Sequence, residues 1–328
     1  MRVVERIAYD EFGLFHENAE EFGLPYPGPP TVRREEVPLG DGRRLSALLW
    51  GDGPPELVLL HGGAQNAHTW DTVALALGRP LVAIDLPGHG HSDGTREGSL
   101  GVKGHAQDVA VAVRALAPDA RAVVGMSLGG MTTIALCGHA PELVQRVVLV
   151  DVLPTVDPSK TKLITDFVNG PRSFASFEDI LARTVEHNPT RTVASLRRGI
   201  LHNAVQQEDG SWVWRHARHR ASAAETAAAG AEGATAAGDG AGTKASGEAA
   251  GEEAARRFAE LWAIIAATTV PLMLVRGMAY SSVLNDDAEA ELRRRLPGAR
   301  VEHVEGAGHS VQGDKPIELA ALIADFVP

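Results

Sequence analysis

Short apolar runs alternate along this chain with longer segments of helical character, and this alternation restricts the possible folds more than any other feature. The apolar runs cover Leu57–Leu60, Leu81–Ile84, Ala122–Val124 and Val147–Val150, and the clearest helical segments are Val102–Leu116 and Leu128–His139. Apolar runs of this length, separated by helices, are typical of a parallel sheet whose strands are buried on both faces. The pattern therefore predicts an α/β fold with a mostly parallel, twisted sheet flanked by helices.

A predicted hairpin precedes this pattern, and further strands and helices follow it near the end of the chain. The hairpin joins strands at Val32–Pro38 and Leu45–Leu49 through a Gly-Asp-Gly turn. The later elements are strands at Leu272–Val275 and Val301–Val304 and helices at Asp287–Leu296 and Ile317–Phe326. We therefore assign residues 31–151 and 269–328 to one core domain.

Two segments fall outside this predicted core. Residues 1–30 form an N-terminal arm, with a short helix expected at 7–22 ahead of a Pro-rich stretch. Residues 152–268 interrupt the alternation and are expected to form an inserted helical cap, or lid, over the sheet. Within the cap, residues 221–250 hold 14 Ala and 6 Gly, which offer almost no side chain to bury. We therefore expect a low-complexity linker at about 221–256 inside the cap.

The charge and the cysteine content restrict the kinds of partner and the cellular compartment that we expect for this protein. The net charge of -11 over 328 residues disfavours nucleic acid and anionic membrane surfaces as partners. Cys137 is the single cysteine, so no internal disulfide can form. No apolar run approaches the roughly 18 residues of a membrane span, and the charged N-terminus does not resemble a signal peptide. These features predict a cytoplasmic protein that acts on a small molecule, and they set no oligomeric state.

The segment Gly125-Met126-Ser127-Leu128-Gly129, between a predicted strand and a predicted helix, is the first candidate for chemistry. A serine on a sharp strand-to-helix turn needs small neighbours, because the backbone there is strained and crowded. The helix that begins at Leu128 directs its N-terminal N–H groups toward the site, where oxyanion charge would develop. The alternative is a Gly-rich turn with a helix-capping serine. The flanking strand and helix favour Ser127 as a nucleophile.

A second Gly-containing loop, His61-Gly62-Gly63-Ala64, follows the predicted strand Leu57–Leu60. Loops at the carboxyl ends of central strands are where open α/β sheets bind ligands. The small residues let backbone N–H groups approach a substrate oxygen. The N–H groups of Gly63 and Leu128 are therefore the candidate oxyanion hole, and His61 is expected to hold the loop by hydrogen bonds.

A candidate base for Ser127 lies in a third loop, Gly306-Ala307-Gly308-His309, which follows the last predicted strand. The small residues before His309 let the loop turn over the sheet edge. An imidazole, whose pKa lies near neutrality, is suited to take the serine proton and to return it to a leaving group. The alternative is an ordinary surface histidine, but the position after the last strand favours His309 as the base.

Together these motifs resemble the α/β-hydrolase fold superfamily over most of residues 30–150 and 270–328. The resemblance rests on His61-Gly62-Gly63, Asp85-Leu86-Pro87-Gly88-His89-Gly90-His91-Ser92, Gly125-Met126-Ser127-Leu128-Gly129-Gly130 and Gly308-His309. It implies a nucleophile, acid and histidine in that chain order, and a structural turn at Gly88–Ser92. Esterases, lactonases and C–C hydrolases share these motifs. Epoxide hydrolases and haloalkane dehalogenases carry aspartate where this chain has Ser127, which disfavours both.

The acid is where the chain departs from that family. The family's acid commonly follows the strand before the last, but residues 276–282 of this chain contain no carboxylate. Some members carry the acid one strand earlier, and here Asp151 follows Val147–Val150 directly. A carboxylate there would orient His309 and stabilise its imidazolium form. We therefore favour Asp151 as the acid, with Asp286 or Asp287 as the alternatives.

These residues predict a serine hydrolase that acts on a carboxylic ester or a related acyl substrate through a Ser127–His309–Asp151 triad and an acyl-enzyme. Such a mechanism requires no cofactor and no metal. The alternatives are a cofactor-free perhydrolase of the haloperoxidase type, a C–C bond hydrolase, or a non-catalytic ligand-binding protein. Aromatic residues of the insertion are candidates for a pocket that takes an apolar acyl or ring group; they are Phe167, Phe174, Phe177, Trp212, Trp214 and Trp262.

Overall fold

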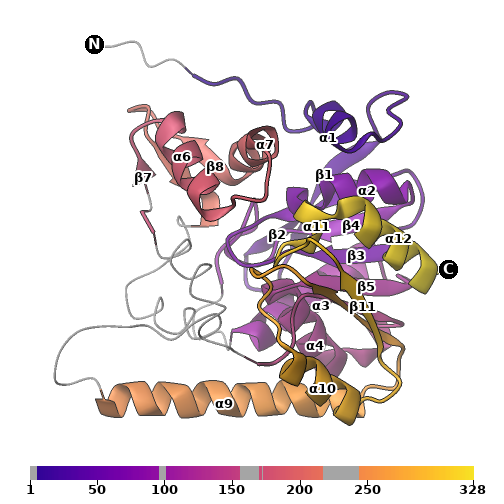
Figure 1. Ribbon diagram of the computed structural model, residues 1–328. Coiled ribbons are helices and arrows are strands. Elements are labelled where there is room, and N and C mark those ends of the chain that lie inside the picture. The colour runs from indigo at the N-terminus through magenta and orange to yellow at the C-terminus, as the bar shows by residue number, and fades with distance from the viewer. Residues whose placement is uncertain (1–5, 96–100, 156–169, 172, 217–243) are drawn as a thin grey trace.

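The computed structural model describes residues 6–95, 101–155, 170–171, 173–216 and 244–328, with backbone alone for 244–251 (Figure 1). Its centre is an eight-stranded sheet with the strand order β1-β2-β4-β3-β5-β6-β10-β11. Strand β2 runs antiparallel to its neighbours β1 and β4, and the other neighbouring strands run parallel. The strands are β1 Val32–Pro38, β2 Arg44–Trp50, β3 Leu57–Leu60, β4 Leu81–Ile84, β5 Ala122–Met126, β6 Val147–Val150, β10 Leu272–Gly277 and β11 Arg300–Val304. The predicted fold class, a mostly parallel sheet flanked by helices, is confirmed.

The central strands are apolar at every position because helices cover both faces of the sheet. Successive side chains of a strand point to opposite faces, so Leu57 and Leu59 enter one core cluster while Val58 and Leu60 enter the other. Fully burying a leucine or valine side chain contributes about 1.5–3 kcal/mol. A polar residue on either face of β3 would therefore weaken one of the two cores.

The helices form one layer on each face. The first layer holds α3 Val102–Leu116, α4 Leu128–His139, α9 Lys244–Ala267 and α10 Asp286–Arg295. The opposite layer holds α1 Phe15–Phe22, α2 Asp71–Leu77 and α12 Pro316–Phe326, together with the short helices η1 Ala67–Trp70 and α11 Val311–Asp314. A further short helix, η2 Pro141–Leu143, follows α4. No helix in the described ranges is both long and apolar enough to cross a membrane.

The described part of the insertion is a small α/β unit rather than a purely helical cap. Its elements are β7 Ser173–Phe174, α6 Phe177–His187, α7 Val193–Asn203, β8 Ala204–Gln206 and β9 Trp212–Trp214. The three strands form an antiparallel sheet in the order β7-β9-β8. The aromatic alternation of β9 buries Trp212 and Trp214 against the two helices, which explains why this segment is a strand.

Helix α9 packs against the core, although its residues fall within the predicted cap. Its buried residues Leu261, Trp262 and Ile265 belong to the core cluster that also holds Ile134 of α4, and Figure 1 shows α9 running beneath the core beside α10. The helix begins at Lys244, inside the segment expected to be a linker. The rest of that linker, residues 221–243, lies outside the described residues.

The N-terminal arm packs against the core, and its helix is shorter than expected. Helix α1 begins at Phe15 rather than near Ile7. The side chain of Asp10 accepts a hydrogen bond from the N–H of Phe12, and its carbonyl accepts one from Gly13 at 3.2 Å. This local turn competes with a helix. The side chain of Phe15 is nonetheless buried in the core.

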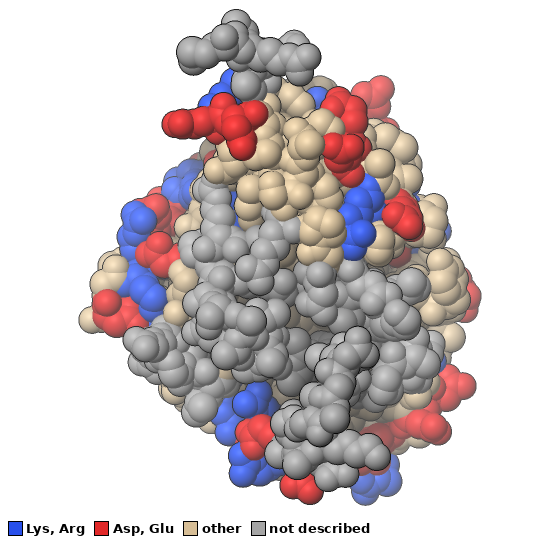
Figure 2. Space-filling view, turned by 90° about the vertical axis from the view of Figure 1, so that its left-hand side faces the viewer, with Lys and Arg blue, Asp and Glu red and all other residues tan. Residues whose placement is uncertain are grey.

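Charged side chains of both signs alternate over the described part of the face in Figure 2, and no broad basic patch is visible there. A nucleic-acid surface typically shows clustered Lys and Arg. The described part of this face shows no such cluster.

Glu289 of α10 ties that helix to β10 and β11. Its carboxylate accepts hydrogen bonds from Arg276 at 2.9 Å, His303 at 2.7 Å and Arg293 at 2.9 Å. Burial raises the pKa of Glu289, but the hydrogen bonds from His303, Arg276 and Arg293 outweigh burial and lower this pKa to about 2. The carboxylate therefore stabilises the fold at neutral pH.

Replacing Glu289 with glutamine is expected to lower the free energy of unfolding at pH 7 by about 1–3 kcal/mol, measured by urea denaturation. Because the folded pKa lies below the unfolded value of 4.5, this contribution is complete above that pH and is lost as the pH falls toward 2. The difference from wild type should therefore shrink at pH 3. Glu305→Gln, which alters an exposed carboxylate in the loop after β11, is the control; an unchanged difference at both pH values would contradict the prediction.

Candidate active site

Ser127 lies on the turn between β5 and α4, in a backbone conformation that side-chain-bearing residues rarely adopt. Its φ is 51° and its ψ is -117°. Close packing enforces this turn, because a Cβ on Gly125 would meet the carbonyl oxygen of Gly129 at 2.4 Å. A Cβ on Gly129 would in turn meet the carbonyl oxygen of Leu60 at 2.2 Å. A serine held in this strained conformation, between a strand and a helix, has the geometry of a nucleophile elbow.

The loop that follows β3 lies beside this serine. A Cβ on Gly62 would lie 3.3 Å from the Cβ of Ser127, so the loop and the elbow are in direct contact. The N–H of Leu128 belongs to the first residue of α4 and has no acceptor within the helix. Gly63 is exposed, and the space around its Cβ position is open. The loop after β3 and the start of α4 thus adjoin one another at the carboxyl ends of β3 and β5.

Two hydrogen bonds of His61 help to hold this loop. His61 Nε2 accepts from the N–H of Leu86 at 2.9 Å, and its Nδ1 lies 2.7 Å from the carbonyl oxygen of Gly62. Nδ1 therefore carries the ring proton. Burial lowers the pKa of His61, which keeps the ring neutral. His61 is a support of the loop rather than a second base, as its sequence context indicates.

Three amide side chains that the sequence analysis did not single out also hold the loop. Gln65 Oε1 accepts from the N–H of Gly62 at 3.1 Å, and Asn203 of the cap donates to the carbonyl oxygen of Ala64 at 2.5 Å. Gln312 of α11 lies 3.4 Å from Gln65 Oε1. Amides scattered over three distant segments leave no motif in the sequence, so only the fold brings them together.

His309 and Asp151 meet at the same edge of the sheet. His309 Nδ1 lies 2.9 Å from Asp151 Oδ2, and the Asp151 carboxylate is fully buried. The carboxylate also accepts from Ser282 Oγ at 2.7 Å and from the N–H groups of Gly277 and Val283 at 3.1 Å each. These donors hold the carboxylate in one orientation, with one oxygen toward the imidazole.

The two alternative acids, Asp286 and Asp287, lie in the first turn of α10. Asp286 Oδ1 pairs with Arg276 at 2.8 Å, and its side chain is 95% exposed. Asp287 follows it in the first turn of the helix, where acidic side chains are favoured by the helix dipole. The helix cap is Asn285, whose side chain accepts from the N–H of Ala288. Neither aspartate contacts His309 within the described part of the chain.

The aromatic residues expected to line a pocket are instead packed among themselves. Phe177 and Trp212 meet edge to face at 5.1 Å, as do Phe174 and Trp214 at 6.0 Å, in the interior of the cap. Trp262 lies on α9 and is buried in the core cluster against which that helix packs. Phe167 lies outside the described residues. The expectation that these five described side chains form a substrate pocket is therefore wrong for Trp262, and it loses support for the four in the cap.

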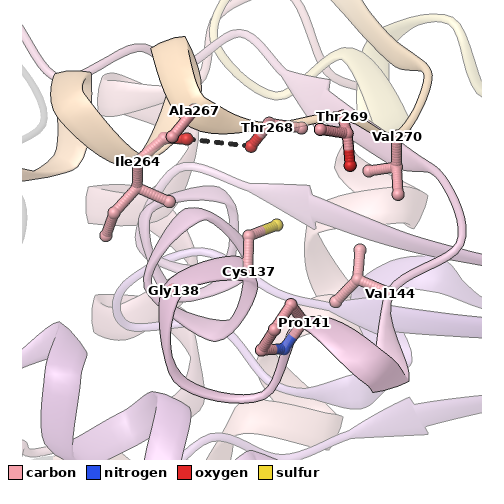
Figure 3. Close-up of a pocket in the computed structure, with 9 residues that line it drawn as sticks. All are labelled: Cys137, Gly138, Pro141, Val144, Ile264, Ala267, Thr268, Thr269 and Val270. Carbon is pink, nitrogen blue, oxygen red and sulfur yellow. Dashed lines mark hydrogen bonds between the residues drawn. The ribbon is translucent and has the colours of Figure 1, made fainter.

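A surface cavity of about 200 Å³ lies between the C-terminal ends of α4 and α9. Figure 3 shows Cys137 pointing into it among apolar neighbours such as Val144 and Ile264. Burial raises the pKa of the Cys137 thiol to about 12, so this thiol is not a reactive thiolate at neutral pH. The cavity is far along α4 from Ser127, since ten residues of helix span about 15 Å. It is separate from the site around Ser127.

Comparison with known proteins places this fold and these motifs in one family. The family model of the α/β-hydrolase fold matches residues 55–316. Esterase Rv0045c of Mycobacterium tuberculosis is 39% identical over 326 residues, which cover 97% of this chain and 96% of that protein. A structure of that esterase, from work on its inhibition by transition metals, superposes with a TM-score of 0.77 over 98% of this chain and 99% of its own.

A more distant relative is the sn-1-specific diacylglycerol lipase ABHD11 of Xenopus laevis. It is 27% identical over 293 residues, which cover 84% of this chain and 80% of that protein. The structure of E-2-(acetamidomethylene)succinate hydrolase shares the fold at a TM-score of 0.70 and 22% identity, covering 90% of this chain and 99% of its own. The match of the family model and the 39% identity over nearly the whole chain lead to one conclusion. The chain belongs to the α/β-hydrolase fold family.

Proposed function

We propose that this protein is a serine esterase that cleaves carboxylic esters through an acyl-enzyme on Ser127. The observation that carries the proposal is the 2.9 Å contact between His309 Nδ1 and Asp151 Oδ2, at the sheet edge where strained Ser127 lies. A histidine held by a carboxylate through Nδ1 has its Nε2 free to accept a proton. This is the arrangement that activates a serine nucleophile.

The proposed reaction proceeds in two halves. Ser127 Oγ attacks the ester carbonyl while its proton passes to Nε2 of His309. The N–H groups of Gly63 and Leu128 hold the tetrahedral oxyanion, which collapses to the acyl-enzyme as His309 protonates the departing alcohol. Water then gives a proton to His309 and attacks the acyl carbon. As the second tetrahedral intermediate collapses, the acyl–Oγ bond breaks, His309 returns the proton to Ser127 Oγ, and the carboxylic acid departs. Asp151 stabilises the imidazolium form in both halves.

The relatives support an ester as the substrate. The Mycobacterium tuberculosis relative is named an esterase, and the Xenopus laevis relative is named an sn-1-specific diacylglycerol lipase. The chain also matches a pimeloyl-[acyl-carrier protein] methyl ester esterase of Pectobacterium carotovorum, but over only 34% of its length. We therefore place the substrate among carboxylic esters of small molecules or lipids.

A fluorophosphonate probe tests the nucleophile and the acyl-enzyme directly. We expect the wild-type protein to take up one equivalent at Ser127, located by peptide mass spectrometry, and to release one equivalent of p-nitrophenol in a rapid burst from p-nitrophenyl acetate. Ser176→Ala, which changes a helix-capping serine of the cap, serves as the matched control and should label normally. A folded protein that takes up no probe and turns over no ester would overturn the proposal in favour of a ligand-binding role.

A further inference from the structure

His68, Asp71 and His202 form a buried cluster that the proposed reaction does not use. His68 lies in η1, Asp71 at the start of α2, and His202 near the end of α7 in the cap. All three side chains are almost fully buried. One potential ligand atom from each residue lies within 4.8 Å of the other two. The cluster thus joins core and cap through two imidazoles and one carboxylate.

The inner atoms of the cluster face one another. His68 Nδ1 lies 2.9 Å from Asp71 Oδ2, and His202 Nε2 lies 3.8 Å from the same oxygen. The two imidazole rings stack with their centroids 3.8 Å apart. Two nitrogens and a carboxylate that converge in this way match the donor set of many protein zinc sites.

The outer nitrogen of each ring is held by an oxygen. His68 Nε2 lies 3.1 Å from Glu11 Oε1, and His202 Nδ1 lies 2.8 Å from the hydroxyl of Tyr9. Histidines that bind metals almost always have their second ring nitrogen fixed by a carboxylate or another oxygen, which orients the ring. Here both histidines have such a partner, supplied by the N-terminal segment.

Two inner atoms of the cluster lack the partners that buried polar atoms normally have. Within the described part of the chain, Asp71 Oδ1 and His202 Nε2 are shielded from solvent and make no hydrogen bond. Leaving a buried polar atom unpaired costs about 1–3 kcal/mol, so such atoms call for an explanation. Both belong to the residues that face the common centre, and a bound cation would satisfy both.

We propose that His68, Asp71 and His202 bind a divalent transition-metal ion, with Zn²⁺ as the best match to two imidazoles and a carboxylate. The rings now lie within 12° of parallel, so coordination by both requires the His202 ring to tilt. This tilt breaks no hydrogen bond at His202 Nε2, because that atom makes none within the described part of the chain. The ion would link α2 of the core to α7 of the cap, beside the loop that Asn203 holds.

The protonation of the two rings sets the conditions for binding. Burial lowers the pKa of His202 well below its usual value, so this ring is neutral and can donate a lone pair. Burial also lowers the pKa of His68, but the carboxylates of Asp71 and Glu11 outweigh burial and raise this pKa to about 9. Metal ions bind imidazole in its neutral form, so a mildly alkaline buffer suits a binding measurement.

Zinc titration of the full chain by isothermal calorimetry, at pH 8 after removal of bound metals with a chelator, tests this site. We expect one Zn²⁺ per chain at this site, and at least about tenfold weaker binding when Tyr9→Phe removes one outer oxygen. Asp71→Asn and His202→Phe, which keep the side-chain shapes, should weaken binding further. Tyr26→Phe and His139→Gln are matched controls outside the cluster and should bind as wild type does.

Zinc affinity that is the same in wild type, Tyr9→Phe, Asp71→Asn and His202→Phe would overturn the proposal, because other histidines of the chain would then hold the ion. Crystals of the wild-type protein soaked in Zn²⁺ provide a second measurement that needs no variant. An anomalous-scattering peak between His68, Asp71 and His202 is expected. A peak only elsewhere, or none, would contradict the site even if the variants fail to fold.

Discussion

Replacing Ser127 with alanine is expected to lower kcat/KM for ester hydrolysis by about 10⁴-fold or more. The variant keeps the loop after β3 and the N-terminus of α4, so it still binds substrate and offers oxyanion donors. It lacks the oxygen that forms the covalent bond, and water must attack the ester directly. The measurement is the steady-state rate with a series of p-nitrophenyl esters of increasing acyl length, with KM compared to that of wild type.

The Ser127→Ala variant is expected to fold normally. The φ of Ser127 is 51°, and alanine tolerates this conformation no better than serine does, so we expect little change in Tm. Ser176→Ala provides the matched background with full activity. Ester turnover by Ser127→Ala equal to that of wild type would refute Ser127 as the nucleophile and would leave the fold assignment intact.

Local sequence pattern was sufficient for the core of this protein. The strands β3, β4 and β6 have the predicted bounds, because each is a short, continuous apolar run that is buried on both faces. Helices α3 and α4 also begin and end as predicted. Strand β5 extends two residues further than expected, through Gly125 and Met126. Glycine has a low strand propensity, so pattern alone ends this strand too early.

Features that depend on long-range packing were not predictable in the same way. Helix α9 looks like part of an Ala-rich insertion, yet Leu261 and Trp262 place it on the core. Asn203 reaches the loop at Ala64 from 139 positions along the chain. The cluster of His68, Asp71 and His202 also joins segments that the sequence separates widely. Such contacts leave no periodic pattern in the sequence. The roles of their residues can therefore be inferred only from the folded structure.

The position of the acid depends on both local sequence pattern and long-range packing. The segment after β10, where the family commonly carries the acid, holds no carboxylate but donates two hydrogen bonds to Asp151, from Ser282 Oγ and the N–H of Val283. The segment thus supports a carboxylate that comes from the neighbouring strand β6. Parallel neighbours end at the same sheet edge, so either strand can bring a carboxylate to His309.

Replacing Asp151 with asparagine is therefore expected to lower kcat by about 10³- to 10⁴-fold with a small change in KM. The asparagine side chain keeps the size of the carboxylate but presents an amide to His309 Nδ1. An amide N–H at this place favours the ring tautomer with its proton on Nε2, and that nitrogen then cannot accept the serine proton. The negative charge that stabilises the imidazolium is lost as well.

The controls for Asp151→Asn are Asp286→Asn and Asp287→Asn, which should keep nearly full kcat because Asp286 pairs with Arg276 and Asp287 lies in the first turn of α10. The buried amide NH₂ at position 151 also faces the N–H of Val283, which loses its acceptor, so circular dichroism and urea denaturation must show that the variant is folded at the assay temperature. A folded Asp151→Asn with wild-type kcat would remove Asp151 from the mechanism. A loss of kcat in Asp286→Asn or Asp287→Asn instead would transfer the role to α10, and the contact between Asp151 and His309 would then be structural only.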